Sequence, residues 1–245
     1  QDPGMSKRWV ISSMTAHDVD RDGLMDVFIG GHGLDGDPGP NSPTDADNGF
    51  PNRMFKGLPD AQFQDVTEDW GLDAEGTRWC LAASFHDFDG DGDNDLYVAN
   101  DFGRNVIYRR SGSPGEPVFT AEVEDPSTAS TGFSMSSTFA DLDGDLDLDM
   151  YVTNMSSTAA RRILEQPGAP EPGTELWRQY RMLSRGNSIM RNVDGRLVEA
   201  PEEDGAVLAN WAWGTSVFDY DCDGDLDIAC VNGFLTTGED DGKDL

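Results

Sequence analysis

The chain has 245 residues and carries 17 Lys and Arg against 47 Asp and Glu, which gives a formal charge of −30. This charge argues against nucleic acid and anionic membranes as partners, and favours cations, basic partners or an extracellular setting. Hydrophobic residues make up 37% of the chain, so we expect a folded domain and not acidic disorder. No stretch approaches the roughly 20 apolar residues of a membrane span.

Four acidic loops follow one another along the chain, each with Asp at positions 1, 3, 5 and 9. In chain order, loops one to four are DVDRDGLMD (18–26), DFDGDGDND (87–95), DLDGDLDLD (141–149) and DYDCDGDLD (219–227). A small hydroxyl residue stands three positions before each first Asp, and a short apolar run follows each ninth position. This pattern predicts two strands joined by an acidic turn, repeated four times.

A second shared element follows the first three loops and predicts a third strand: NRMFK (52–56), NVIYR (105–109) and NSIMR (187–191). The segments AQFQDVT, EPVFTAEV and GRLVEAP then predict a fourth strand. The loops begin 69, 54 and 78 residues apart, and insertions at one equivalent turn, 32–51 and 155–186, account for most of the difference. A four-stranded unit of about 50 residues therefore recurs.

Tandem four-stranded units without intervening helices predict an all-β fold, a β-propeller of four-stranded blades; a β-sandwich with acidic loops is the alternative. We expect one propeller segment over residues 1–245, with about three and a half blades. The predicted blades are 6–71 (insertion 32–51), 77–125, 131–205 (partly helical insertion 155–186) and 209–245. The fourth is incomplete, so we expect further blades or another protein chain to complete the ring.

Carboxylates at alternate positions of a tight turn can converge on one hard cation, and calcium accepts 6–8 oxygens of this kind. We expect the backbone carbonyl at position 7 to supply one more oxygen. Magnesium is less favoured because it demands strict octahedral geometry, and transition metals prefer imidazole or thiolate. We therefore predict about four Ca²⁺ ions, one per loop. The predicted ligands are Asp18, Asp20, Asp22, Leu24, Asp26, Asp87, Asp89, Asp91, Asp93, Asp95, Asp141, Asp143, Asp145, Asp147, Asp149, Asp219, Asp221, Asp223, Asp225 and Asp227.

An EF-hand begins in the same way but needs a bidentate Glu at position 12 and flanking helices. Position 12 is occupied here by Ile29, Val98, Val152 and Cys230, all within predicted strands. The sequence therefore excludes an EF-hand.

The DxDxDGxxD loops, in repeats of this length, resemble the FG-GAP/VCBS repeats of integrin α-subunit-type β-propellers. The third-strand element and FQDVTEDWGL (63–72) more closely resemble bacterial secreted VCBS proteins of the ASPIC/UnbV type. The resemblance covers nearly the whole chain outside the insertions. It implies a chiefly structural calcium ion at positions 1, 3, 5, 7 and 9 of each loop. Loop three departs from the pattern, because Leu146 replaces a turn Gly. Of the four sites, this is the one whose geometry the family pattern specifies least.

The two insertions have different compositions. Residues 32–51 predict a surface loop rich in Gly, Pro and Asp, in which His32 and four aspartates offer an alternative cation site. Residues 155–186 are locally basic, and TELWRQYRMLSRG predicts a helix capped by Thr174 and ended by Gly186. Its apolar face (Leu176, Tyr180, Leu183) is expected to pack on the propeller, with recognition of a partner as the alternative.

We expect a non-enzymatic, calcium-stabilised binding or assembly module that is secreted, periplasmic or on the cell surface. Its expected partners are proteins, with glycans as an alternative and nucleic acid excluded. His17 and His86 precede their loops, yet no Ser or Cys is placed as an evident nucleophile. The alternative function is a carbohydrate-active propeller, either a lectin or a polysaccharide lyase or hydrolase. Cys222 and Cys230 are close enough in sequence for a disulfide, which the sequence alone does not decide.

Overall fold

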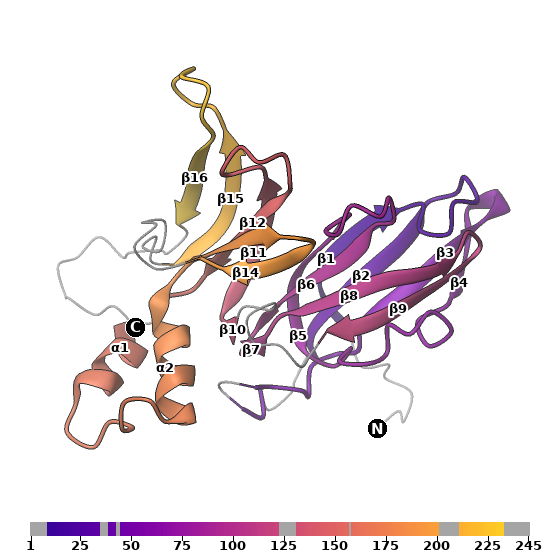
Figure 1. Ribbon diagram of the computed structural model, residues 1–245. Helices are drawn as coiled ribbons and strands as arrows, with labels where there is room; N and C mark the ends of the chain where they lie inside the picture. Colours follow the sequence, from indigo (N-terminus) through magenta and orange to yellow (C-terminus); the bar gives the residue numbers. More distant parts are fainter. Residues whose placement is uncertain are drawn as a thin grey trace, which may run out of the picture.

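The structure is a computed structural model, and it describes residues 9–34, 39–42, 45–122, 131–156, 158–200 and 211–232. In this part of the chain, strands dominate and form three four-stranded antiparallel sheets, in which neighbouring strands follow chain order (Figure 1). The first sheet contains β1 (Trp9–His17), β2 (Asp26–Leu34), β3 (Arg53–Leu58) and β4 (Gln62–Asp65), with the 3₁₀ turn η1 (Pro59–Ala61) before β4. The second contains β5 (Trp79–His86), β6 (Asp95–Asp101), β8 (Val106–Ser113) and β9 (Glu116–Glu122). The third contains β11 (Ser134–Ala140), β12 (Asp149–Asn154), β13 (Ser188–Val193) and β14 (Arg196–Glu199).

The fourth repeat is described as a hairpin, β15 (Ala212–Phe218) and β16 (Asp227–Asn232), and the rest of the predicted fourth blade lies outside the described residues. A short bridge joins β7 (Gly103–Arg104) to β10 (Thr131–Gly132), which links the second repeat to the third. The all-β prediction is therefore confirmed, with four-stranded antiparallel sheets as its unit.

The four repeats share one strand register. The small hydroxyl residue of each first strand lies opposite the same position of the second strand, as in the pairs Ser84 with Tyr97 and Thr138 with Tyr151. In each first strand, the pairing with the second strand also shifts register between two residues that stand seven and five positions before the loop. In the second sheet these residues are Cys80 and Ala82. The equivalent shifts lie at Ile11/Ser13, Ser134/Ser136 and Ala212/Gly214. Because pairing register decides which face each side chain occupies, the repeats present equivalent faces.

The first strands of successive repeats contact one another, β1 with β5, β5 with β11 and β11 with β15. The remaining strands of each sheet spread outward from this row (Figure 1). Two apolar cores fill the space between the sheets. The core between the first and second sheets includes Phe28, Met54, Leu96 and Tyr108. Each large side chain buried in this way stabilises the fold by roughly 1.5–3 kcal/mol relative to exposure.

A second core lies between the second and third sheets and includes Phe88, Tyr97, Met150 and Met190. As a result, every residue of β6 and β12 is buried, because each of these strands has a sheet on both sides. In β16, the equivalent strand of the fourth repeat, the burial pattern alternates between partly buried and exposed residues.

The insertion 155–186 folds as two helices, α1 (Thr158–Glu165) and α2 (Glu175–Arg185), which pack against each other. The predicted helix and its caps are confirmed: the Oγ1 of Thr174 accepts the N–H of Trp177, and Gly186 follows the last helical residue with φ 101°. α1 was not expected. The predicted apolar stripe is only partly buried, because Leu176 is 50% exposed, and the side chain of Leu183 lies outside the described residues. None of the helices described is long and apolar enough to cross a membrane.

Candidate metal centres

The four acidic loops adopt the same backbone turn, with positive φ at positions 4 and 6. Position 4 is Arg21, Gly90, Gly144 and Cys222, and position 6 is Gly23, Gly92, Leu146 and Gly224. The left-handed region is costly for residues other than Gly, so its occurrence at equivalent positions points to a common constraint. Loop three keeps the turn in spite of Leu146, whose φ is 76°. The substitution therefore does not change the loop conformation that the pattern predicts.

The carboxylate at position 1 holds the turn closed by accepting backbone N–H groups. In loop one the two oxygens of Asp18 accept the N–H groups of Asp22 and Gly23, each at 3.0 Å. In loop two Asp87 accepts from Gly90 at 2.8 Å and from Gly92 at 2.9 Å. Asp141 and Asp219 make the equivalent bonds in loops three and four. These bonds aim the position 1 carboxylate at the centre of the turn.

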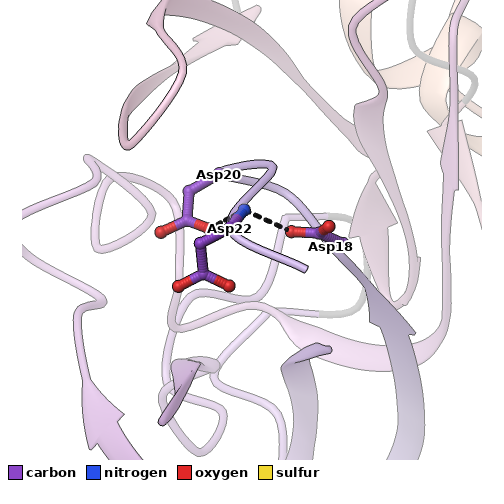
Figure 2. A group of neighbouring side chains, drawn as sticks. All are labelled: Asp18, Asp20 and Asp22. Carbon is purple, nitrogen blue, oxygen red and sulfur yellow. Dashed lines mark hydrogen bonds between the residues drawn. The ribbon is translucent and has the colours of Figure 1, made fainter. Parts of the chain in front are cut away.

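Positions 3 and 5 complete a group of carboxylates around that centre. Asp20 accepts the N–H of Asp22 at 3.1 Å, and Asp22 accepts the N–H of Leu24 at 2.9 Å. Figure 2 shows Asp18, Asp20 and Asp22 gathered around the turn, with the N–H of Asp22 donating within the group.

In every loop, three carboxylates each offer an oxygen within 4.8 Å of the other two. The groups are Asp18, Asp20 and Asp22; Asp87, Asp89 and Asp91; Asp141, Asp143 and Asp149; and Asp219, Asp221 and Asp227. Two unit charges at this distance repel by about 1 kcal/mol even in a water-like dielectric. A bound cation would remove that repulsion, and the all-oxygen donor set suits a hard ion such as calcium.

Position 9 has a different environment from the other carboxylates, because it lies in the sheet and is buried in the first three repeats. Asp26 accepts the N–H of Val19 in its own loop and the N–H of Gly57 in the third strand, both at 2.9 Å. Asp149 likewise accepts from Leu142 at 3.0 Å and from Asn192 at 2.8 Å. This carboxylate therefore ties the loop to the third strand, whether or not it also contacts an ion.

Burial raises the pKa of Asp95 to about 6, although the backbone N–H of Arg110 and the guanidinium of Arg109 stabilise its charged form. Burial also raises the pKa of Asp26. A nearby cation would lower both pKa values again, because an opposite charge favours the ionised carboxylate.

The basic residue that ends each third-strand element reaches its own acidic loop. The Nζ of Lys56 forms ion pairs with Asp20 and, at 2.9 Å, with Asp22. Arg109 pairs with Asp95 at 2.7 Å, and Arg191 pairs with Asp149 at 2.9 Å. Sequence reasoning found these residues as a shared pattern but gave them no role. Their recurrence as the fifth residue of each third-strand element was the available signal.

The Asn that begins each third-strand element also has a common role. Its Oδ1 accepts the backbone N–H of the residue at position 14, near the end of the second strand. The pairs are Asn52 with Gly31 at 3.0 Å, Asn105 with Asn100 at 2.7 Å, and Asn187 with Asn154 at 2.9 Å. These buried amides close each sheet at the end opposite the acidic loop.

Position 7 was expected to supply a backbone carbonyl, and this stays a prediction. In loop two the side chain at position 7, Asp93, forms ion pairs with Arg21 of loop one and with Arg110.

In the first insertion, Asp45 pairs with Arg78 at 2.7 Å and with Arg104 at 3.3 Å. Burial would raise the pKa of Asp45, but the bonds and charges of these two arginines lower it.

Among the described residues, this insertion adds no further cluster of carboxylates, and Asp35 and Asp37 lie outside them. The three cysteines are free thiols in the structure, so Cys222 and Cys230 are not bridged.

Two overlapping stretches, residues 18–98 and 87–152, match the family model described as the FG-GAP-like repeat. Together they cover more than half of the chain. The chain belongs to the FG-GAP-like repeat family. The matched stretches contain the first three acidic loops, and loop four has the same turn in the structure. A search of curated proteins found no match.

Proposed function

We propose that this chain is a calcium-binding β-propeller module that works outside the cytoplasm as a non-enzymatic binding or assembly scaffold. The observation that carries the proposal is the recurrence, at the same turn of all four repeats, of a three-carboxylate cluster built from positions 1 and 3 with either position 5 or position 9. A single acidic turn could be a solvated hairpin. Four turns with the same backbone, each with the position 6 N–H bonded to the position 1 carboxylate, are better explained by a common ligand, and calcium fits the oxygen donors.

The arrangement of the sheets supports the propeller. Successive first strands contact one another, and the second sheet packs between its neighbours, as blades do around an axis.

Calcium would act on stability through the loops. Each loop joins the first and second strands, and in the first three repeats its position 9 carboxylate also bonds to the third strand. In these three repeats, an ion held by the clustered carboxylates therefore stabilises a unit that spans three strands. Four ions would bring the formal charge from −30 to about −22. Extracellular calcium modules bind with Kd on the order of 10⁻⁴–10⁻³ M, which matches calcium levels outside the cytoplasm.

The histidines ahead of the loops support a non-enzymatic role. The His86 ring lies 3.8 Å from the Phe139 ring between centroids, and burial lowers the pKa of His86 to about 4. The His17 ring lies 5.8 Å from that of Phe85. Both rings therefore serve in packing between sheets. Incubation with acidic polysaccharides and analysis of the products, together with a calcium-containing glycan array, would test for the carbohydrate-active alternative.

The calcium proposal is tested by calorimetric titration and thermal melting of the full chain. Each site filled at 100 times its Kd adds about 2.7 kcal/mol, and 1 kcal/mol shifts the Tm of a chain of this size by about 2–4 °C. We therefore expect excess EGTA to lower the Tm by 10 °C or more, and Mg²⁺ at the same concentration to restore little of it.

Asp89→Asn keeps the Oδ1 that accepts the N–H of Asp91 but removes the charge, so it should abolish one binding event and lower the Tm only when calcium is present. Asp69→Asn, an exposed change outside the loops, is the matched control. An unchanged melt in EGTA would contradict the proposal.

A further inference from the structure

Loops one and two contact each other directly. The guanidinium of Arg21, at position 4 of loop one, donates to the carbonyl oxygen of Gly92 and to the carboxylate of Asp93. These two residues hold positions 6 and 7 of loop two. At position 8, the Nδ2 of Asn94 lies 3.0 Å from the Nε2 of His17, which directly precedes loop one. Side chains from both loops therefore join the first acidic turn to the second.

A buried arginine holds the same two loops together from within the interface between the sheets. Arg110 forms an ion pair with Asp93, and its Nε donates to the carbonyl oxygen of Val19 in loop one at 3.2 Å. In the turn between β8 and β9, the backbone N–H of Gly115 donates to the carbonyl oxygen of Asp20 at 2.8 Å. The Asp93 carboxylate is thus held between a guanidinium of its own repeat and the guanidinium that reaches across from loop one.

The later loops lack the residues for this link. Position 4 is Gly90 in loop two and Gly144 in loop three, and neither has a side chain that could reach the next loop. Position 8 is Leu148 in loop three and Leu226 in loop four, and neither can form the hydrogen bond that Asn94 offers. A link through these side chains is therefore specific to loops one and two, and is not a property of the repeat in general.

Arg21 has a backbone conformation that is costly for any residue other than Gly. Its φ is 62°, in the left-handed region, where loops two and three have Gly90 and Gly144. An ion in loop one would be held by Asp20 and Asp22, the neighbours of Arg21 on either side. The ion would therefore hold Arg21 in this conformation and keep its guanidinium on loop two.

The guanidinium of Arg21 does not compete with calcium for the predicted ligands of loop two. The predicted ligand at position 7 is the backbone carbonyl of Asp93, whereas Arg21 bonds to the side chain of that residue and to the carbonyl of position 6. Lys56 differs, because it pairs with two predicted ligand carboxylates, Asp20 and Asp22. Arg21 therefore orders the backbone beside a ligand without blocking one, and this lowers the cost of ordering loop two when the ion binds.

We propose that Arg21 is a positioning residue for the calcium site of loop two, through which calcium in loop one strengthens calcium binding in loop two. The inference rests on the proposed function, because it concerns the same ions. Such coupling is reciprocal, so calcium in loop two strengthens binding in loop one by the same factor. The Arg21 side chain is 49% exposed, so we expect a factor of about ten, towards the low end of the usual range for coupled sites.

A calcium titration of the full chain, followed by the NMR signals of backbone amides, measures the sites separately. The N–H groups of Gly23, Gly92 and Gly224 each bond to the position 1 carboxylate of their own loop, so they report on loops one, two and four. With a coupling factor of about ten, two sites of similar intrinsic affinity fill together. Calcium at half-filling then falls about threefold, the square root of that factor. We therefore expect steeper curves at Gly23 and Gly92 than at Gly224.

Three matched variants each disable one site. They are Asp22→Asn in loop one, Asp91→Asn in loop two and Asp221→Asn in loop four, and each removes a charge but keeps the Oδ1 that accepts a backbone N–H. Asp22→Asn should raise the calcium concentration at half-filling of loop two by about threefold, and Asp91→Asn should do the same for loop one. Asp221→Asn is the control and should change neither.

Arg21→Gly separates positioning from a general effect on stability, because Gly already occupies position 4 of loops two and three. In the Arg21→Gly chain, we expect Asp22→Asn to leave the loop two curve unchanged, which closes a double-mutant cycle. Arg21→Lys keeps a charged donor at this position, so it should retain part of the coupling.

Three results would overturn the inference. They are a loop two curve that Asp22→Asn leaves unchanged, an equal response in the Arg21→Gly chain, and tighter binding in loop two once site one is disabled. The last result would show that the two ions repel each other. The calcium proposal fails separately. Amide signals that do not respond to calcium in any loop would contradict both proposals, whereas independent binding at each loop would contradict only the coupling.

Discussion

Arg110 of the second sheet and Val19 of the first acidic loop are joined by a buried hydrogen bond, 3.2 Å from the guanidinium Nε to the carbonyl oxygen. The same guanidinium forms an ion pair with Asp93 of loop two, and Asp93 pairs in turn with Arg21 of loop one. One arginine thus connects two acidic loops and two sheets. The loops are therefore part of the interface between repeats and not appendages of single hairpins.

Arg110→Met should destabilise the chain by about 2–3 kcal/mol, because it leaves the carbonyl of Val19 and the carboxylate of Asp93 without a buried donor. Urea unfolding followed by tryptophan fluorescence would measure the loss. Arg53→Met is the matched control. Its guanidinium lies 3.9 Å from Asp65 and both side chains are partly exposed, so less than about 1 kcal/mol is expected. Equal effects of the two variants would contradict the role given to Arg110.

Asn105→Ala should destabilise the chain by about 2–3 kcal/mol. The buried amide accepts the N–H of Asn100 at 2.7 Å and donates to the Oγ of Ser134 at 2.9 Å, so the truncation leaves the N–H of Asn100 unpaired and removes one of the two bonds of Ser134, whose Oγ still donates to Asn154. Asn105→Asp keeps the acceptor for Asn100 but loses the donor to Ser134. We expect an intermediate loss at neutral pH, measured by urea unfolding. Asn105→Ala with wild-type stability would contradict this account.

Leu146→Gly should stabilise the chain by about 1 kcal/mol. Leu146 has a φ of 76° and is 89% exposed, so Gly relieves a left-handed conformation without removing buried surface. Leu148→Gly, two residues on in the same loop and outside the positive-φ set, should instead destabilise by a similar amount. Thermal melts of both variants in EGTA isolate the turn from calcium binding. Destabilisation by Leu146→Gly would show that Leu146 has a packing role.

Lys56→Met should tighten calcium binding at loop one by up to about tenfold, because the ammonium pairs with two predicted ligands, Asp20 and Asp22. The hydrogen bond from Lys56 lowers the pKa of Asp22, and the bond to Asp20 raises the pKa of Lys56, so each charge stabilises the other in the absence of an ion. The same variant should be less stable than wild type in EGTA. Lys56→Arg, which keeps the charge, is the control. Calcium titration of the three proteins would detect the change, and unaltered binding by Lys56→Met would contradict it.

The three thiols should react at different rates. Cys80 is buried and desolvation raises its pKa to about 12, so its thiolate, the reactive form, is scarce in the folded protein. Cys222 is exposed at position 4 of loop four. We expect an alkylating reagent at neutral pH to label Cys222 within minutes and Cys80 only after unfolding, as read by peptide mass spectrometry. Rapid labelling of Cys80 in the native state would contradict its burial.

The repeat, the acidic turns and the order of the strands were predictable from the sequence. Turn chemistry is local: Asp side chains at positions 1, 3 and 5 bond to backbone N–H groups two to five residues away. The alternation of apolar residues in the strands is also local, so the four-stranded units could be inferred before any contact was known. The helix behind Thr174 was predictable for the same reason, since capping acts within one turn.

The role of position 9 and of the third strand became clear only from the tertiary structure. Asp26 bonds to Gly57, 31 residues away, and Asn192 bonds to Phe88 across 104 residues. No local pattern specifies such partners, because they depend on how whole sheets pack.

The exposure of Phe218, Tyr220 and Val231 has the same origin. In sequence they resemble their buried equivalents, and only the stacking of the sheets shows that they face outward. The sequence by itself determined the units and their acidic turns, because these depend on neighbouring residues. The tertiary structure decided which groups join the units and which face stays open, because those contacts arise only when sheets distant in sequence meet.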